Sequence, residues 1–240
     1  MIPPFTCRQY TDFVWRVLFS TLFVGLCVGS GVASAGDCPP LERLRDGATV
    51  GQLSDETLAC LVTVRDDTSQ IENRAEASRL LIADSHAKGI LTQWAHHVQI
   101  HLDHLDDSDP DLMYRYGLHL LKFGAPSEAV KRTEEALKHL DSWASLTDRE
   151  DRLFNLLKLR TDAGIAVLGV VRSANPPDEM IIRATESRIR LYAVEWLAQA
   201  QRTRRDYTPA LAACVNTSWN QPRCVQRATG VPSPWTNLGQ

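Results

Sequence analysis

The 240-residue sequence predicts an all-α protein of stacked antiparallel helix pairs, with a longer helical pair as a C-terminal cap. Three observations predict this fold class. Apolar residues recur at helical spacing over most of the chain, helix-capping residues stand where those helices begin, and the pattern requires no strand. With 44% hydrophobic residues, the chain also has enough apolar surface for a substantial core.

Seven helices are predicted, at residues 54–65, 70–87, 91–105, 110–123, 126–140, 148–171 and 178–205. Two of them begin at sequences typical of capping boxes. One box pairs Ser69 with Glu72, and the other pairs Thr147 with Glu150. In each box, both side chains are expected to accept a hydrogen bond from a backbone N–H that has no partner inside the helix.

Proline and glycine mark further helix ends. Pro110 and Pro126 fit the first turn of a helix, where the missing N–H costs no hydrogen bond. Gly89 and Gly124 fall where one helix must stop and the chain must turn.

The charge balance excludes one class of partner. The chain contains 26 Lys and Arg against 29 Asp and Glu, a net charge of −3. Because nucleic acid and anionic membranes are held by positive fields, we expect no nucleic-acid partner.

The N-terminus has the layout of a secretory signal peptide. Arg8 and Arg16 precede an uncharged run over residues 17–32, and Ala33-Ser34-Ala35 follows it. We expect cleavage after Ala35, which leaves a mature chain without a membrane span in the periplasm or outside the cell. An uncleaved anchor is the alternative, but the run is shorter than the roughly 20 apolar residues that span a bilayer. Lipid attachment at Cys38 is less favoured, since Gly36-Asp37 precede it.

Four cysteines remain after that cleavage, namely Cys38, Cys60, Cys214 and Cys224. An even number in an oxidising compartment predicts disulfides, and three connectivities are possible. We expect the local pairs Cys38–Cys60 and Cys214–Cys224, because a bridge needs Cα atoms within about 7 Å and an elongated stack keeps its ends apart. A zinc site is disfavoured, since no C-x-x-C pair is present.

A repeat stands in the middle of the chain. Small residues lie at positions where paired helices pack or turn, namely Gly117, Gly124, Ala129 and Ala136. Thirty-four residues before Gly117 and Ala129 stand Ala83 and Ala95. Residues 110–143 therefore resemble a tetratricopeptide repeat, and the resemblance extends over roughly residues 75–143. Met113, Thr133 and Leu102 depart from the family pattern.

This resemblance implies an α-solenoid with five regions. They are a signal peptide (1–35), an N-terminal helical cap with a disulfide (36–68), tetratricopeptide-like repeats (69–143), a long helical pair and cap (144–214), and a disulfide-closed flexible tail (215–240). In such repeats the first helix of each pair lines a binding groove. The matching positions here are Asp84, Lys88, Asp111, Tyr114, Leu118 and Lys122. Their mixed charges suit a peptide of mixed charge.

The whole chain also resembles exported helical-repeat proteins of myxobacteria, uncharacterised in role, that share a cysteine near each end. The residues behind this resemblance are GQLSDETLAC at 51–60, SDPDLMYRYGLHL at 108–120 and the segment from Cys214 to Cys224. It implies a periplasmic or secreted repeat protein.

Three histidines suggest a metal site. His97, His101 and His104 are spaced so that their rings share one face of the helix predicted at 91–105. We interpret this face as exposed, acidic and without metal, because a zinc site also needs a ligand from a second element. The alternative is a metal-dependent or hydrolytic envelope enzyme that uses this face.

Arginines recur on one face of the helix predicted at 178–205, namely Arg183, Arg190, Arg202, Arg204 and Arg205. We interpret this face as solvated, and an acidic partner is the alternative.

The sequence favours a binding protein over an enzyme. It contains no phosphate-binding loop, no dinucleotide fingerprint, no H-E-x-x-H and no G-x-S-x-G. We therefore expect a non-catalytic protein without cofactors that binds or scaffolds a protein or peptide of the cell envelope.

Overall fold

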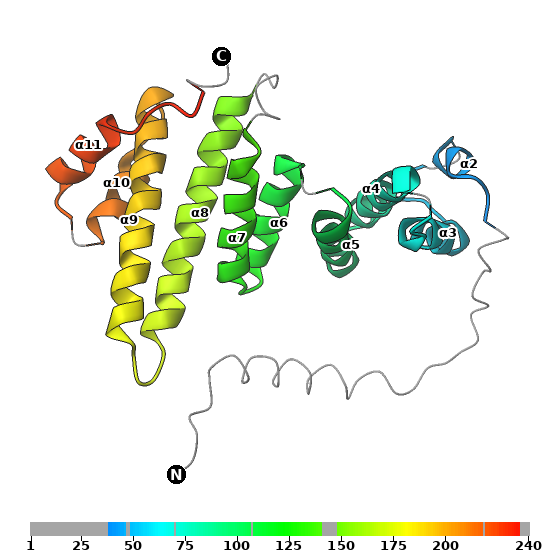
Figure 1. The fold of residues 1–240 in the computed structure, drawn as a ribbon, viewed down its shortest axis with the longest axis horizontal. Coiled ribbons are helices and arrows are strands. Elements are labelled where there is room, and N and C mark those ends of the chain that lie inside the picture. Colours follow the sequence, from blue (N-terminus) through cyan, green and yellow to red (C-terminus); the bar gives the residue numbers. More distant parts are fainter. Residues whose placement is uncertain are drawn as a thin grey trace, which may run out of the picture. The chain divides into compact units, whose positions relative to one another are not determined.

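The computed structural model describes residues 38–46, 49–69, 71–106, 108–140, 148–217 and 219–235 (Figure 1). All regular elements within these ranges are helices, so the all-α class is confirmed. The chain divides into two units, Met1–Pro39 and Pro40–Gln240, and the helices belong to the second. The signal peptide predicted at 1–35 lies outside the described residues.

The helices are α2 (Leu41–Asp46), α3 (Asp55–Asp66), α4 (Ile71–Ala87), α5 (Leu91–His104), α6 (Pro110–Lys122), α7 (Pro126–Lys138), α8 (Arg149–Arg172), α9 (Glu179–Arg202), α10 (Thr208–Val215) and α11 (Gln221–Thr229). The bounds of α3 to α9 agree with the seven predicted helices to within three residues at each end. Helix α11 lies in the segment that the sequence predicts to be a flexible tail.

Side-chain caps stabilise several helix starts. Ser54, Asp109, Asp178 and Asn220 each accept a hydrogen bond from a backbone N–H in the first turn of α3, α6, α9 and α11. At Ser69, where a capping box is expected, the backbone N–H and the hydroxyl both donate to the Asp67 carboxylate, at 2.9 and 2.7 Å, and α4 begins two residues later at Ile71. Thr147, from the second predicted box, lies outside the described residues.

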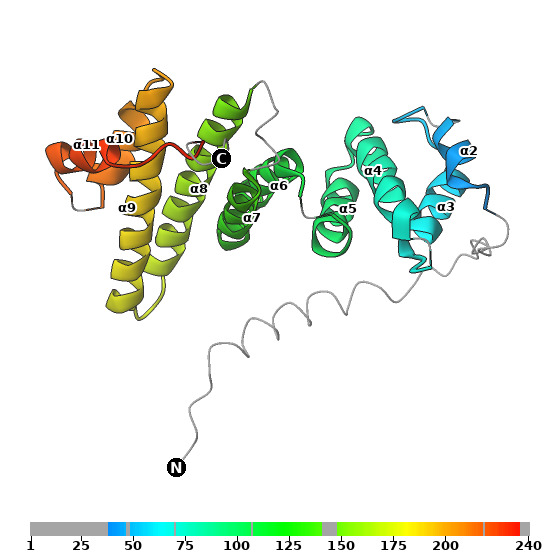
Figure 2. The same cartoon turned by 45° about the horizontal axis from the view of Figure 1, so that its top comes forward.

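Helices adjacent in the chain pack on one another. Contacts join α3 to α4, α4 to α5, α6 to α7, α7 to α8 and α8 to α9, and Figures 1 and 2 both show α8 and α9 side by side. Gly117 permits a close approach of α6 to α8, since a Cβ there would lie 3.0 Å from Leu159 Cδ2 of α8. Ala129 and Ala136 are 0% exposed, so the small residues of the repeat lie where helices meet.

Two glycines allow the turns between helices. Gly89 ends the turn between α4 and α5 with φ of 69°, and Gly124 stands between α6 and α7 with φ of 81°. Both angles lie in the left-handed region, where a side chain costs roughly 1 kcal/mol or more. The predicted role of both glycines is confirmed.

The second half of α9 is largely buried. Every residue from 192 to 200 is buried except Glu195, which is half-buried. Helix α8 covers one side of α9, and α10 and α11 cover another. Apolar side chains on more than one face of this half of α9 need cover on more than one side.

A disulfide joins the two C-terminal helices. Cys214 of α10 and Cys224 of α11 are bonded with a Cα–Cα distance of 6.2 Å, and both are 0% exposed. This confirms the local C-terminal pair. Cys38 and Cys60 are disulfide-bonded as well.

Among the described helices, none combines the length and the apolar character that crossing a bilayer requires.

A pair of glycine substitutions tests the turn geometry. Gly124→Ala should lower the free energy of unfolding by about 1 kcal/mol, because alanine disfavours a positive φ. Gly169→Ala, inside α8 with no atom within 4 Å of the added Cβ, should raise it by about 0.5–1 kcal/mol. Urea unfolding followed by circular dichroism measures both, and equal effects of the two variants would contradict the turn assignment.

Candidate functional site

The six predicted groove residues do not line one common groove in the structure. Asp84 and Lys88 form an internal brace. The Asp84 carboxylate is 1% exposed and accepts hydrogen bonds from the N–H of Gly51 at 2.8 Å and of Leu53 at 3.3 Å. Lys88 Nζ lies 2.7 Å from Asp84 Oδ2 and donates to the carbonyl of Leu53 at 2.9 Å. This brace fastens the segment before α3 to α4, so Asp84 is not available to a partner.

The four remaining residues lie on α6. Asp111 and Tyr114 line a pocket of about 210 Å³ between α6 and α8, in which the Asp111 carboxylate pairs with Arg152. Leu118 is 43% exposed and lies outside this pocket. Lys122 is exposed, with Nζ 5.8 Å from the ring centroid of Phe123.

The three histidines do not form a common ligand set. His97 Nδ1 accepts a hydrogen bond from Arg65 Nη1 at 3.1 Å, and His101 is 0% exposed, with neither ring nitrogen bonded among the described residues. His104 is exposed. The interpretation of this face as exposed is therefore wrong at His101, which packs inward beside Val98 and Leu102 on the buried side of α5.

Burial disfavours the charged form of two of these rings. Burial, together with the neighbouring Arg65 and His96, lowers the pKa of His97 to about 4, and burial also lowers the pKa of His101. Within the described ranges, no group of three or more His, Cys, Asp or Glu side chains is placed to hold a metal ion.

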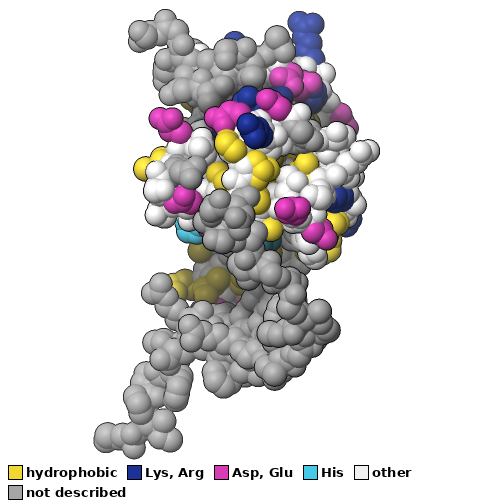
Figure 3. Space-filling model, turned by 90° about the vertical axis from the view of Figure 1, so that its right-hand side faces the viewer, with side chains coloured by type: hydrophobic (Ala, Val, Ile, Leu, Met, Phe, Trp, Pro, Cys, Tyr) yellow, Lys and Arg dark blue, Asp and Glu magenta, His cyan; other side chains and the backbone are white. Residues whose placement is uncertain are grey.

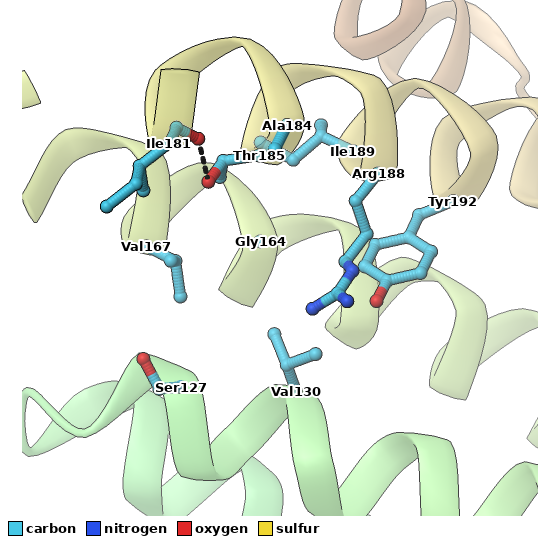
Figure 4. A pocket seen from close by; sticks show the side chains of 10 residues that line it. All are labelled: Ser127, Val130, Gly164, Val167, Ile181, Ala184, Thr185, Arg188, Ile189 and Tyr192. Carbon is cyan, nitrogen blue, oxygen red and sulfur yellow. Dashed lines mark hydrogen bonds between the residues drawn. The ribbon is translucent and has the colours of Figure 1, made fainter. Parts of the chain in front are cut away.

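A pocket lies between α7, α8 and α9, and we call it the three-helix groove. It encloses about 290 Å³. Its lining residues are Ser127, Val130, Gly164, Val167, Ile181, Ala184, Thr185, Arg188, Ile189 and Tyr192. Figure 4 shows Ser127 and Val130 of α7 facing the side chains of α9 across the groove, with Val167 of α8 beside them.

A glycine on α8 sets the depth of this groove. A Cβ at Gly164 would lie 3.2 Å from Ile189 Cγ1, so the absence of a side chain lets α8 and α9 approach closely. Ile189 is 1% exposed at the base, whereas Ile181 is 48% exposed at the rim. The groove therefore has an apolar base and an apolar rim that is open to solvent.

Polar groups fix one end of the three-helix groove. The Tyr192 hydroxyl donates to the Glu134 carboxylate, and the guanidinium of Arg160 lies 4.2 Å from the Tyr192 ring centroid. Burial raises the pKa of Tyr192, and the hydrogen bond to Glu134 adds to this effect, so the phenol is a neutral donor. Arg188 is exposed and points into the groove beside Tyr192 (Figure 4).

A second and larger pocket lies between α9 and α11, and we call it the α9–α11 groove. It encloses about 1120 Å³. Its lining residues are Leu191, Val194, Glu195, Trp219, Asn220, Pro222, Arg223, Gln226, Arg227, Gly230, Val231 and Pro232. Periodicity over 178–205 could not find this groove, because one wall belongs to the predicted tail. Asn220 and Pro222 are the signal that was missed, since an N-cap followed by proline in the first turn indicates a helix start.

The distribution of charge differs between the two ends of the helical unit. Figure 3 views the molecule from the side that lies to the right in Figure 1, where α2 and α3 are, and acidic and basic side chains are mixed there with apolar ones. Beyond α9 the balance changes, because residues 203–240 contain four arginines and no lysine against one acidic residue, Asp206.

Comparisons with known proteins found no match among protein-family models, curated proteins or solved structures.

The brace at Asp84 can be tested against a surface carboxylate. Asp84→Asn should lower the free energy of unfolding by about 1–3 kcal/mol, because it removes a buried ion pair and weakens two charge-assisted hydrogen bonds. Asp111→Asn, at a side chain that is 48% exposed, should cost less than about 1 kcal/mol. Denaturant unfolding of both variants measures the difference, and the brace is not structural if Asp84→Asn is the milder change.

Acid should destabilise the protein through His97, which is half-buried. The folded-state pKa of His97, about 4, lies below its unfolded value of 6.5, so the unfolded chain binds more protons between these pH values. The contribution of His97 to the free energy of unfolding is therefore fully present above pH 6.5. It decreases as the pH falls towards 4, by at most about 1.4 kcal/mol per pH unit. Unfolding free energies at several pH values measure this slope.

His97→Gln should flatten the slope, since its amide oxygen can still accept from Arg65 but does not titrate in this range. The control is His104→Gln, which removes an exposed histidine from the same helix. Identical slopes in the two variants would contradict the assignment to His97.

Proposed function

We propose that this chain is an exported, non-catalytic helical-repeat protein that binds or scaffolds a protein or peptide of the cell envelope. The three-helix groove is the observation that carries this proposal. Its exposed rim residue Ile181 and its buried base at Ile189 offer apolar surface to a ligand, while Tyr192 and Arg188 supply polar contacts at one end. Grooves with apolar walls and a few fixed polar groups are typical of binding sites.

The packing of α6, α7 and α8 supports a tetratricopeptide-like arrangement as part of this proposal. In that arrangement each helix pair buries its apolar face only by stacking on the next pair. Here α6 contacts both α7 and α8, and Gly117 permits close approach to Leu159 of α8 and Thr133 of α7. Helices α8 and α9, each of 24 residues, are long enough to cover the end of such a stack.

The cysteines support export. Cys38, Cys60, Cys214 and Cys224 are all disulfide-bonded, which favours an oxidising compartment such as the periplasm or the extracellular space. The N-terminal sequence, with two arginines, an uncharged run and Ala33-Ser34-Ala35, gives the route to that compartment.

The alternative of a metal-dependent or hydrolytic enzyme loses its candidate site. The His101 ring is buried in the core side of α5, and the Nδ1 atom of His97 is engaged by Arg65. A zinc site needs ring nitrogens that converge on one point, which these two side chains do not provide. The geometry of α5 therefore favours a structural role for its histidines.

Site-specific photocrosslinking in cells tests the proposed binding at the three-helix groove. A photoreactive phenylalanine analogue at Ala184, which is exposed and lines the groove, should give adducts of discrete mass with envelope proteins or peptides. The same analogue at Ser187, exposed on α9 but outside the lining, is the control. We expect several-fold more adduct at position 184. Equal labelling at both positions, or adducts at neither, would count against the function.

A further inference from the structure

The α9–α11 groove has a cationic and aromatic centre. Three guanidinium groups surround the ring of Trp219, with Arg223 at 4.4 Å, Arg190 at 5.1 Å and Arg227 at 6.0 Å from its centroid. A guanidinium group beside an aromatic ring is held in place and keeps N–H donors at its edges, which can bind a carboxylate through two hydrogen bonds.

The three arginines differ in what they can offer to a ligand. Arg190 is already engaged, because its Nε donates to the carbonyl of Thr217 at 3.0 Å. Arg223 and Arg227 are exposed, and among the described residues neither forms an ion pair. The only acidic residue of the lining is Glu195, whose carboxylate pairs with Arg160 of α8. The groove therefore holds two positive charges that no carboxylate of the described chain neutralises.

Apolar side chains stand beside these charges. Leu191 is 58% exposed on α9, and Val231 and Pro232 line the same groove after α11. Exposed leucine next to arginine favours a ligand that brings both apolar and acidic groups.

The wall that carries Trp219 is held in place before any ligand arrives. The disulfide from Cys214 to Cys224 closes the short loop in which Trp219 lies, and Asn220 caps α11 by accepting from the N–H of Arg223 at 3.0 Å. A preformed wall avoids the entropy cost of ordering a loop on binding.

We propose that the α9–α11 groove binds an acidic peptide segment of a partner protein, one that combines carboxylates with a large apolar side chain. The inference rests on the proposed binding function and names the class of partner. Carboxylates of the segment pair with Arg223 and Arg227, and its apolar side chain packs on Leu191. Nucleic acid is disfavoured, because two unpaired arginines in a chain of net charge −3 give too weak a positive field.

Fluorescence anisotropy on the full mature chain tests this proposal. The probe is a labelled 12-residue peptide of Glu, Asp and Leu, and the control peptide has Gln and Asn in place of Glu and Asp. We expect the acidic peptide to bind more tightly and its affinity to fall with added salt, since exposed charge pairs are screened. Equal binding of the two peptides would overturn the proposal.

A charge-matched pair of variants locates the site. Arg223→Gln with Arg227→Gln should weaken binding of the acidic peptide about tenfold, roughly 1.4 kcal/mol. Arg115→Gln with Arg183→Gln removes the same charge from exposed positions on α6 and α9 outside this groove, and should change affinity less than about twofold. Equal losses in the two double variants would show a nonspecific charge effect and overturn the assignment.

Nuclear magnetic resonance of the indole N–H groups gives a measurement on the wild-type chain, so its result does not depend on whether the arginine variants fold. The acidic peptide should shift the Trp219 signal of the wild-type chain, which Trp219→Phe identifies by its loss. A peptide that leaves this signal unmoved would contradict the site. If a single-stranded oligonucleotide of equal charge displaces the peptide as effectively as unlabelled peptide does, the groove recognises charge alone and the peptide assignment is wrong.

The proposed function and this inference can fail separately. Crosslinks at Ala184 together with no acidic-peptide binding would overturn the inference alone. Absence of both would overturn the inference and the proposed function.

Discussion

The need to cover α9 on two faces determines the C-terminal half of the structure. Its residues from Tyr192 to Ala200 are buried except Glu195, and most of them are apolar, so side chains on more than one face of this helix must be kept from water. Helix α8 covers one face, where the rings of Phe154 and Trp196 lie 6.0 Å apart in an edge-to-face contact. The other face requires α10 and α11, whose alanines and disulfide pack into the same core.

This double cover also generates both grooves, because α9 forms a wall of each. Towards α7 and α8 it presents Ile181, Ile189 and Tyr192, and towards α11 it presents Leu191 and Val194. The face towards α7 and α8 is mainly apolar, with a neutral phenol and Arg188 at one end, while the face towards α11 meets Arg223 and Arg227. One helix thus supports two surfaces of different chemistry.

Features that depend on residues close in sequence can be predicted, and those that depend on distant contacts cannot. Helical periodicity and the turn glycines Gly89 and Gly124 locate α3 to α9, because both signals are local. The Asp84 brace joins residues 31 and 33 positions apart, so no local pattern indicates that this carboxylate is buried. Periodicity gives the faces of a helix but not which of them meets a neighbour, and for this reason it misplaces His101 on an exposed face. Periodicity also does not reveal helix α11 in the segment predicted to be a flexible tail, because the amphipathic pattern of α11 spans only nine residues.

Amide hydrogen exchange tests whether α11 is an ordered cover on which the buried half of α9 depends. The comparison is between the wild-type chain and the Cys214→Ser, Cys224→Ser double variant. We expect Gln221–Thr229 to be protected in the wild type. The variant should lose this protection and with it part of the protection of residues 192–200, while α6 and α7 are unchanged. Rapid exchange throughout α11 in the wild type would contradict this expectation, as would full protection of residues 192–200 in a variant whose α11 has lost its own.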